Sequence, residues 1–168
     1  METVTFVDGF GRAVQVKKDG VVTSASKGNS AKDENVMIVS GRNVYDAFGR
    51  VAKAFYPTTE GTGSKSTFSK SFDNVSPTVT VYDVLDRATS VTLPDNSTTT
   101  TAYTVDNGSH ALVTTVTDAL HNVQATHTNG SGKTLKTIQK SGPDGEITTS
   151  FEYDGIQRLV RVTDTEGN

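Results

Sequence analysis

Five aspartates recur along the chain within short motifs of one pattern, and four of them are followed four residues later by an arginine. The pairs are Asp8 and Arg12, Asp46 and Arg50, Asp83 and Arg87, and Asp154 and Arg158. A carboxylate beside a guanidinium could bind a charged ligand. The same spacing also places both groups across one tight turn, where an exposed ion pair contributes only about 0–1 kcal/mol. We favour the structural interpretation of these pairs.

The motif is complete at residues 45–50, which read Tyr-Asp-Ala-Phe-Gly-Arg. Aspartate at the first position of a turn can accept a hydrogen bond from the backbone two residues on, and the fourth position favours the left-handed conformation. The fourth positions are occupied by Gly11, Gly49, Asp86, His121 and Gln157, of which the glutamine fits least well. The pattern predicts hairpin turns at residues 8–12, 46–50, 83–87, 118–122 and 154–158, with Asp118 followed by Asn122 in the fourth.

A short strand is predicted after each of these turns. The residue five positions after each aspartate is apolar: Ala13, Val51, Ala88, Val123 and Leu159. Apolar and polar residues then alternate, which is typical of a strand with one buried face.

Two further sets of turn residues divide each repeat. Eleven residues past the aspartates stand Asp19-Gly20, Pro57, Pro94-Asp95-Asn96, Asn129-Gly130 and Thr165-Glu166-Gly167. A looser set comprises Lys27-Gly28-Asn29, Asp73-Asn74, Asp106-Asn107-Gly108 and Gly142-Pro143-Asp144-Gly145. Together they predict about three strands per repeat.

The composition agrees with a β-sheet protein that has a thin core. Among 168 residues, Val occurs 21 times, Leu 6 times and Thr 27 times, and β-branched residues suit a half-buried pleated surface. The five aspartates are 35 to 38 residues apart. We therefore predict an all-β protein, a single array of about five repeated units over residues 1–168, cut from a larger protein.

The motif at residues 45–50, followed by an alternating strand, resembles the YD repeat of Rhs proteins, of the B and C components of bacterial insecticidal toxin complexes, and of teneurins. The resemblance covers roughly residues 4–168. Val7 and Thr117 stand where the repeat has Tyr, as at Tyr45, Tyr82 and Tyr153. The resemblance implies tandem antiparallel hairpins that form a curved or spiralling sheet. Such a sheet would be either a shell around a toxin or a surface adhesion module.

The tyrosines and histidines have structural explanations that need no ligand. Tyr45, Tyr82 and Tyr153 fit cross-strand packing better than a platform that stacks sugars. His121 and His127 are six residues apart, and the third histidine is His110, so no zinc spacing is present and no metal or cofactor is expected.

The segment Gly61-Thr62-Gly63-Ser64-Lys65-Ser66-Thr67 is similar to a phosphate-binding loop, but Ser64 separates the glycine from the lysine. No helix is predicted after it, so we interpret it as a loop. The chain has no cysteine and no Gly-x-Ser-x-Gly motif. Its carboxylates lie mostly in the repeated turns, and we expect no enzyme activity.

The net charge and the distribution of basic residues limit the classes of partner that this chain could bind. The formal charge is −3, without the clustered lysines and arginines that nucleic acid or an anionic membrane would require. We expect neither nucleic-acid binding nor membrane insertion, and a secreted or cell-surface location whose export signal lies outside this segment.

Two functions remain open. The first is a structural role in the wall of a shell that encloses a toxin or polypeptide cargo, with the remainder of the polypeptide or toxin-complex subunits as partners. The second is an adhesion module that binds carbohydrate or a surface protein. In either case, the terminal strands at residues 4–7 and 159–163 are apolar enough to self-associate.

One prediction concerns the second turn. Gly49→Val should lower the thermal stability more than Arg50→Ala, because a β-branched residue adopts positive φ only at a cost of roughly 1–3 kcal/mol. Thermal unfolding followed by circular dichroism measures both changes. An equal or larger loss in the arginine variant would mean that the arginines, and not the turn geometry, hold the hairpins together.

Overall fold

The computed structural model describes residues 2–24, 31–70, 75–140 and 145–167. Within these ranges the chain forms antiparallel β-strands and one short 3-10 helix, η1 (Thr62–Ser64), so the predicted all-β class is confirmed. None of the helical structure in the described ranges is long and apolar enough to cross a membrane. The chain forms two compact units, Met1–Thr80 with Leu93–Asn96, and Val81–Thr92 with Ser97–Asn168.

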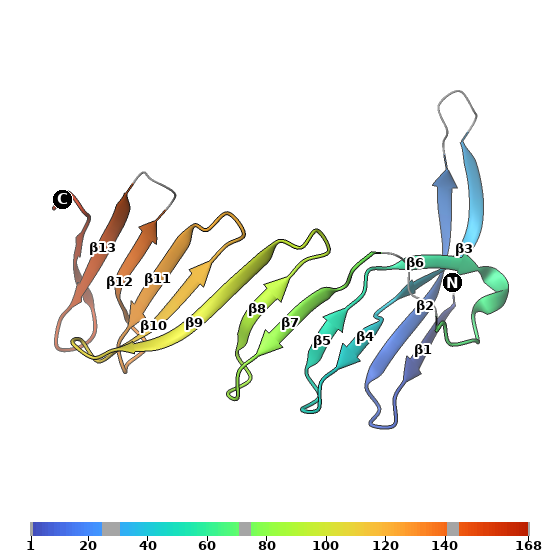
Figure 1. The fold of residues 1–168 in the computed structure, drawn as a ribbon, viewed down its shortest axis with the longest axis horizontal. Helices are drawn as coiled ribbons and strands as arrows, with labels where there is room; N and C mark the ends of the chain where they lie inside the picture. The colour runs from blue at the N-terminus through green and yellow to red at the C-terminus, as the bar shows by residue number, and fades with distance from the viewer. Residues whose placement is uncertain (1, 25–30, 71–74, 141–144, 168) are drawn as a thin grey trace. The chain divides into compact units, whose positions relative to one another are not determined.

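The first unit contains a four-stranded antiparallel sheet in the order β1-β2-β3-β6 (Figure 1). Its strands are β1 (Thr3–Val7), β2 (Ala13–Ser24), β3 (Lys32–Ser40) and β6 (Thr58–Gly61). β2 is the longest and pairs with β3 from Val16 opposite Ser40 to Ser24 opposite Lys32. The turn at residues 8–12 joins β1 to β2.

The turn predicted at Asp19-Gly20 is wrong, because both residues lie inside β2 and pair with β3. A Cβ atom on Gly20 would lie 2.4 Å from Cδ1 of Ile38. This glycine therefore permits a close approach within the sheet, which is the other common reason for a glycine in a strand. The Asp19 carboxylate accepts a hydrogen bond from the backbone N–H of Glu2 at 2.8 Å.

The turn predicted at Pro57 is also wrong. The hairpin of β4 (Asn43–Tyr45) and β5 (Val51–Ala54) holds the turn at residues 46–50, and β5 pairs with the start of β7 (Thr78–Tyr82). Residues 55–57 then lead from β5 into β6. β6 belongs to the four-stranded sheet β1-β2-β3-β6, whereas β4 and β5 belong to a different sheet. The proline lies in this crossing, where its missing N–H removes no hydrogen bond between strands.

The core of the first unit combines apolar and polar side chains. Val36, Met37 and Val39 of β3 are buried. Residues 62–69 lie against β2, where the side chain of Gln15 exchanges two hydrogen bonds with the backbone of Ser69, at 3.1 and 2.9 Å. Because these amide groups satisfy one another, the polar contact can be buried without a large cost.

A lysine is fully buried beside this contact. Nζ of Lys17 donates to Oε2 of Glu60 at 2.6 Å and to the backbone oxygen of Ser64 at 2.9 Å. The Lys17 side chain is 0% exposed and that of Glu60 is 26% exposed. The hydrogen bond from Lys17, followed by those from Ser69 and Ser64, lowers the pKa of Glu60 to about 2. The ion pair joins β6 to β2, and the bond from Lys17 to the Ser64 carbonyl holds the segment after β6 against β2.

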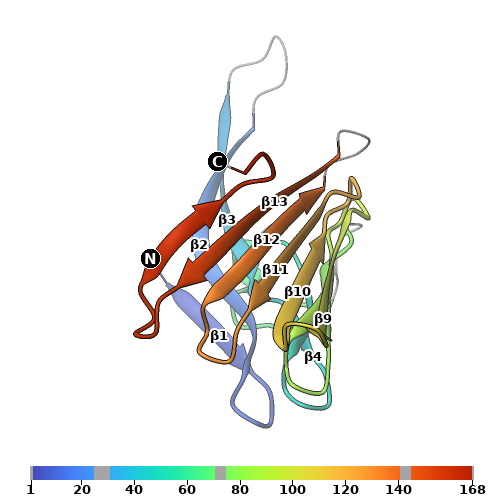
Figure 2. The ribbon, with the colours of Figure 1, turned by 90° about the vertical axis from the view of Figure 1, so that its left-hand side faces the viewer.

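The second unit is an antiparallel sheet whose strands follow one another in chain order (Figure 2). Its strands are β8 (Ala88–Thr92), β9 (Thr98–Asp106), β10 (Ala111–Thr117), β11 (Val123–Thr128), β12 (Thr134–Lys140), β13 (Glu146–Tyr153) and β14 (Leu159–Thr163). Three strands separate the turn at 83–87 from that at 118–122, and three more lead to the turn at 154–158. The predicted three strands per repeat are confirmed.

Most of the other predicted turns in this part of the chain are confirmed. Turns connect β8 to β9 at residues 93–97, β9 to β10 at 107–110, and β11 to β12 at 129–133. Another follows β14 at Thr165-Glu166-Gly167. The turns predicted at Lys27-Gly28-Asn29, at Asp73-Asn74 and at Gly142-Pro143-Asp144 lie outside the described residues.

The second unit buries little apolar surface, as the composition predicts. Ala111, Val113 and Ala125 are its buried hydrophobic residues within the described ranges. A row of threonines crosses four strands, with Thr114 opposite Thr126, Thr126 opposite Thr137, and Thr137 opposite Thr149. Such cross-strand pairs contribute roughly 0.2–1 kcal/mol each, so the sheet depends on many small contacts between neighbouring strands.

The buried ion pair generates a prediction with a defined pH dependence. Glu60→Gln should destabilise the protein by about 3 kcal/mol at pH 7, because the variant leaves the Lys17 charge buried without its charged partner. A carboxylate with a lowered pKa stabilises the fold above its ordinary pKa of 4.5, and this stabilisation is lost as the pH falls towards about 2. The difference between variant and wild type should therefore shrink between these pH values, measured by urea unfolding.

The control is Glu2→Gln. Its partner Lys65 lies 2.7 Å away, but both side chains are about half exposed, and exposed pairs contribute about 0–1 kcal/mol. Equal losses in the two variants at neutral pH would contradict the importance of burial at Lys17.

Candidate functional site

The five predicted turns share one hydrogen-bond pattern, which the second turn illustrates. Oδ1 of Asp46 accepts the backbone N–H groups of Phe48 and Arg50 at 2.9 and 3.0 Å, and Oδ2 accepts Nε of Arg50 at 2.7 Å. The backbone N–H of Asp46 donates to the Arg50 carbonyl, and that of Gly49 donates to the Asp46 carbonyl. One carboxylate thus holds three donors and fixes the whole turn.

The fourth residue of every one of these turns has positive φ, as predicted. The values are 78° at Gly11, 84° at Gly49, 62° at Asp86, 64° at His121 and 67° at Gln157. Gln157 therefore adopts the turn geometry although its residue type fits least well. The rest of its turn is regular, since Arg158 donates to Asp154 through both its backbone N–H and Nε.

Each predicted Asp/Arg pair lies within one turn. Arg12, Arg50, Arg87 and Arg158 contact their aspartates Asp8, Asp46, Asp83 and Asp154 at 2.6 to 2.7 Å. In the fourth turn, Nδ2 of Asn122 donates to Oδ2 of Asp118 at 2.8 Å in place of the arginine. The carboxylates are occupied by their own turns, which favours the structural interpretation.

Hydrogen bonding lowers the pKa of these carboxyl groups. The side-chain hydrogen bond from Arg12 is the largest effect on the pKa of Asp8, and the side chain of Asn122 is the largest effect on that of Asp118. The hydrogen bond from the backbone N–H of Arg158 is the largest effect on the pKa of Asp154. At Asp46 and Asp83 burial, which raises the pKa, is the largest single effect, and the hydrogen bonds together outweigh it.

Two more of the predicted turns, at residues 129–133 and 164–167, have the same kind of hydrogen bonding, which the sequence analysis did not foresee. Oδ1 of Asn129 accepts the backbone N–H groups of Ser131 and Lys133, both at 2.9 Å, and Gly132 has φ of 78°. Oδ1 of Asp164 accepts the N–H of Glu166 at 2.9 Å. The sequence signal for this hydrogen bonding was an Asn or Asp three residues before a glycine, without a tyrosine directly before it.

Tyrosines connect one hairpin to an earlier turn. The hydroxyl of Tyr45 donates to the carbonyl of Ala13 at 2.8 Å, and its ring lies 4.3 Å from the guanidinium carbon of Arg12. Tyr153 repeats this arrangement with the carbonyl of Thr134 and the ammonium of Lys133. Tyr82 ends β7 directly before its turn. Packing between strands is therefore observed at Tyr45 and Tyr153.

Tyr103 makes the same connection, although no aspartate directly follows it, and it was missed in the sequence. Its hydroxyl donates to the carbonyl of Ala88 at 3.4 Å, and the Arg87 guanidinium carbon lies 3.9 Å from its ring centre. In all three connections the cation is the fifth residue of a turn and the carbonyl belongs to the next residue. A cation over an aromatic face contributes about 0.5–2 kcal/mol.

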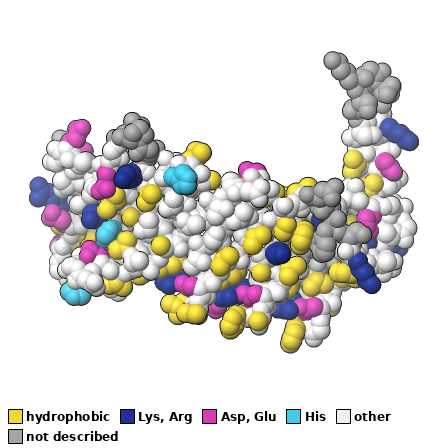
Figure 3. Space-filling view, viewed as in Figure 1, with side chains coloured by type: hydrophobic (Ala, Val, Ile, Leu, Met, Phe, Trp, Pro, Cys, Tyr) yellow, Lys and Arg dark blue, Asp and Glu magenta, His cyan; other side chains and the backbone are white. Residues whose placement is uncertain are grey.

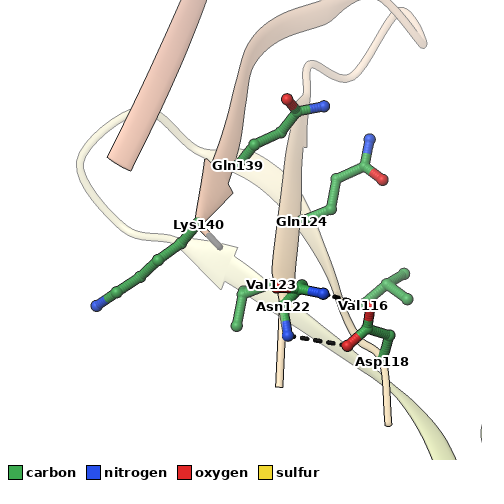
Figure 4. A pocket seen from close by; sticks show the side chains of 7 residues that line it. All are labelled: Val116, Asp118, Asn122, Val123, Gln124, Gln139 and Lys140. Carbon is green, nitrogen blue, oxygen red and sulfur yellow. Dashed lines mark hydrogen bonds between the residues drawn. The ribbon is translucent and has the colours of Figure 1, made fainter. Parts of the chain in front are cut away.

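A hollow in the second unit lies beside one of the turns and is shown in Figure 4. It has a volume of about 290 Å³ and is lined by Val116, Asp118, Asn122, Val123, Gln124, Gln139 and Lys140. The amides of Gln124 and Gln139 extend from paired positions on β11 and β12, and Asp118 is engaged by Asn122. The hollow offers amide groups and an apolar wall but no nucleophile paired with a base.

A second polar hollow contains Asp106, Ser109 and His127. Oγ of Ser109 donates to Oδ2 of Asp106 at 2.6 Å, and Nδ1 of His127 lies 3.8 Å from the same oxygen. The hydroxyl is directed at the carboxylate and not at the imidazole, so this is not the arrangement of a catalytic triad. His121 lies in its turn and His110 has φ of 54°. Among the described residues, no group of three or more possible ligands is placed to hold a metal ion.

The segment from Gly61 to Thr67 also lacks the geometry of a phosphate loop. It forms the three-residue η1 and a following turn, so it offers no helix N-terminus to a phosphate. Its Lys65 is paired with Glu2.

No model of a known protein family matches the chain, and no curated protein matches it. Solved structures do match its fold. The crystal structure of TcdB2-TccC3 is 18% identical, with a TM-score of 0.65 over 96% of this chain. The crystal structure of TcdB2-TccC3-TEV is 19% identical, with a TM-score of 0.66 over 96% of this chain. In both cases the match spans only 9% of the longer chain. At this identity the likeness shows the fold alone.

The two extra turns provide a test of what the aspartate contributes. Asp118→Asn should retain most of the thermal stability, since Asn129 accepts the same two backbone N–H groups without a charge. Asp118→Ala removes the acceptor for Leu120 and Asn122 and should lower the melting temperature by on the order of 5 °C. Calorimetry of both variants decides the matter. Equal losses would mean that the charge, and not the acceptor, forms the turn.

Proposed function

We propose that this chain is a non-catalytic structural segment of a β-shell wall, of the type that YD (Rhs) repeats form around a toxin or polypeptide cargo. The observation that carries the proposal is the succession of hairpins with the same aspartate-centred turn over most of the chain. The fold likeness to TcdB2-TccC3 chains supports it, since 96% of this chain matches a small part of a much longer one.

The physical construction of the second unit suits a wall. Its sheet buries few apolar residues, and each hairpin is connected to the next by strand pairing and by tyrosine contacts such as that of Tyr103. In such an array, each unit is stabilised mainly by its neighbours. A sheet of this kind can be extended by further hairpins, and it needs no thick core on either face. Both properties suit a wall that encloses a volume.

The remaining proposals follow from this role. The partners would be the remainder of the same polypeptide or toxin-complex subunits, and the location would be outside the cytoplasm or at the cell surface. We propose no enzyme activity, since the carboxylates Asp8, Asp46, Asp83, Asp118 and Asp154 are engaged in turns. Adhesion through carbohydrate or protein binding is the alternative function.

The wall proposal predicts that the chain pairs through its sheet edges. β1 and β14 are edge strands of their sheets in the described structure, and Val160 of β14 is 61% exposed. An exposed edge presents unpaired backbone groups to another strand. Sedimentation velocity over a concentration series should show association of the wild-type chain, which Val160→Lys combined with Thr5→Lys should weaken.

Thr5 is the better position on β1 because it is exposed, whereas Phe6 packs against Phe68 with ring centres 5.6 Å apart. Lysine at Phe6 would damage the fold as well as the edge. A chain that stays monomeric at all concentrations, and that binds a defined sugar on a glycan array, would favour the adhesion module instead.

A further inference from the structure

The chain contains two Asn-Gly pairs, and both lie in turns of the second unit. Residues 107–109 and 129–131 have the same sequence, Asn-Gly-Ser. The first turn follows β9 and the second follows β11. Much of the surface in Figure 3 is white, the colour of backbone and of uncharged polar side chains. Such groups are mostly unreactive, but an asparagine followed by glycine is an exception because it can react with its own backbone.

An asparagine in such a pair can lose its amide without an enzyme. The backbone nitrogen of the glycine loses its proton to hydroxide and attacks Cγ of the asparagine. A C–N bond forms, and the side-chain nitrogen takes up a proton from water and leaves as ammonia. Water then opens the resulting succinimide ring at either carbonyl, which gives aspartate or isoaspartate. Glycine favours the reaction because it has no Cβ to hinder the approach of its nitrogen.

The turn at Asn129 opposes this reaction. Oδ1 of Asn129 accepts the backbone N–H groups of Ser131 and Lys133, both at 2.9 Å. The Asn129 N–H donates to the Lys133 carbonyl, and the Gly132 N–H donates to the Asn129 carbonyl. Side chain and backbone are therefore both held. Cγ of Asn129 can rotate against the Gly130 nitrogen only after these hydrogen bonds open.

The turn at Asn107 does not hold the asparagine side chain. Here the preceding aspartate accepts the hydrogen bonds of the turn, since Oδ1 of Asp106 accepts the Gly108 N–H at 3.0 Å and Oδ2 accepts the Ser109 hydroxyl at 2.6 Å. Asn107 is exposed, and within the described ranges its side chain makes no hydrogen bond. The bond to Asp106 holds the Gly108 nitrogen in place and leaves the Asn107 amide free to rotate.

We propose that Asn107 is a site of spontaneous deamidation in the folded chain, and that Asn129 is protected by its own turn. The hydrogen bonds that form the repeated turn thus also protect the residue that accepts them. Asp8 and Asp154 likewise precede a glycine, and two backbone N–H groups hold each of these carboxylates. Reaction at Asn107 adds a negative charge beside Asp106, at the start of the turn between β9 and β10.

The experiment compares the two asparagines within one molecule. The purified chain is kept at mildly alkaline pH and physiological temperature, folded in one sample and unfolded in guanidinium chloride in the other. Cleavage before Asp106 and Asp118 places the two asparagines in different peptides. Mass spectrometry then measures the fraction of each amide that is lost over time. Labelling by an isoaspartate methyltransferase identifies the product of ring opening.

In the folded chain we expect Asn107 to lose its amide about tenfold or more faster than Asn129, because the turn at Asn129 must open first. In the unfolded chain the two rates should agree within about twofold, since the same two residues follow each asparagine and little structure restrains them. Isoaspartate should accumulate at residue 107 of the folded chain.

Two glycine variants test the cause of the difference. Gly108→Ala should slow the loss at Asn107, because the added methyl group hinders the attacking nitrogen. The nearest atom to that Cβ is Oδ1 of Asp106 at 3.5 Å, an ordinary contact that the fold accepts. Gly132→Val should speed the loss at Asn129 and leave Asn107 unchanged, because Gly132 has φ of 78° and valine opens the turn. Circular dichroism checks that each variant is folded.

Equal rates at the two asparagines of the folded wild-type chain would overturn the proposal. A faster loss at Asn129 would do so as well, because its two N–H donors would then stabilise the charge that develops on Oδ1 during the attack. Continued protection of Asn129 in a folded Gly132→Val variant would mean that the turn is not the cause. None of these results bears on the association experiments that test the wall function.

Discussion

The architecture depends on the aspartate at the start of each turn. A single carboxylate, as in Asp46, accepts two backbone N–H groups through one oxygen and a side-chain donor through the other. This leaves little freedom for the chain between two strands, and it compensates for the entropy that a thin hydrophobic core could not overcome alone. The turn at Asn129 forms with the same oxygen and no charge, so the geometry of the acceptor matters more than the ion pair.

The turns also connect successive hairpins. The basic residue that closes a turn, such as Arg12 or Arg87, lies under the ring of a tyrosine from a later strand, and the next carbonyl accepts the tyrosine hydroxyl. Local and long-range order therefore share the same few residues. The first unit departs from this plan, since the segment after β6 lies against β2 and is held there by the buried Lys17 and its partner Glu60.

The repeated turn has fixed positions and one position whose residue type varies. The turn has an Asp or Asn acceptor at its first position and a left-handed fourth residue, whereas its third residue varies, as Ser131 shows.

The sequence by itself determined the β class and the five turns, because these depend on contacts between residues only a few positions apart, whereas it only suggested about three strands per repeat. It could not separate Asp19-Gly20, which lies inside β2, from Asn129-Gly130, which forms a turn, since both pairs have the local signature. Packing against Ile38 decides the first case. The burial of Lys17 and the contact of Tyr103 with Arg87 were likewise decided only by the tertiary structure, because they join residues whose separation along the chain carries no periodic signal.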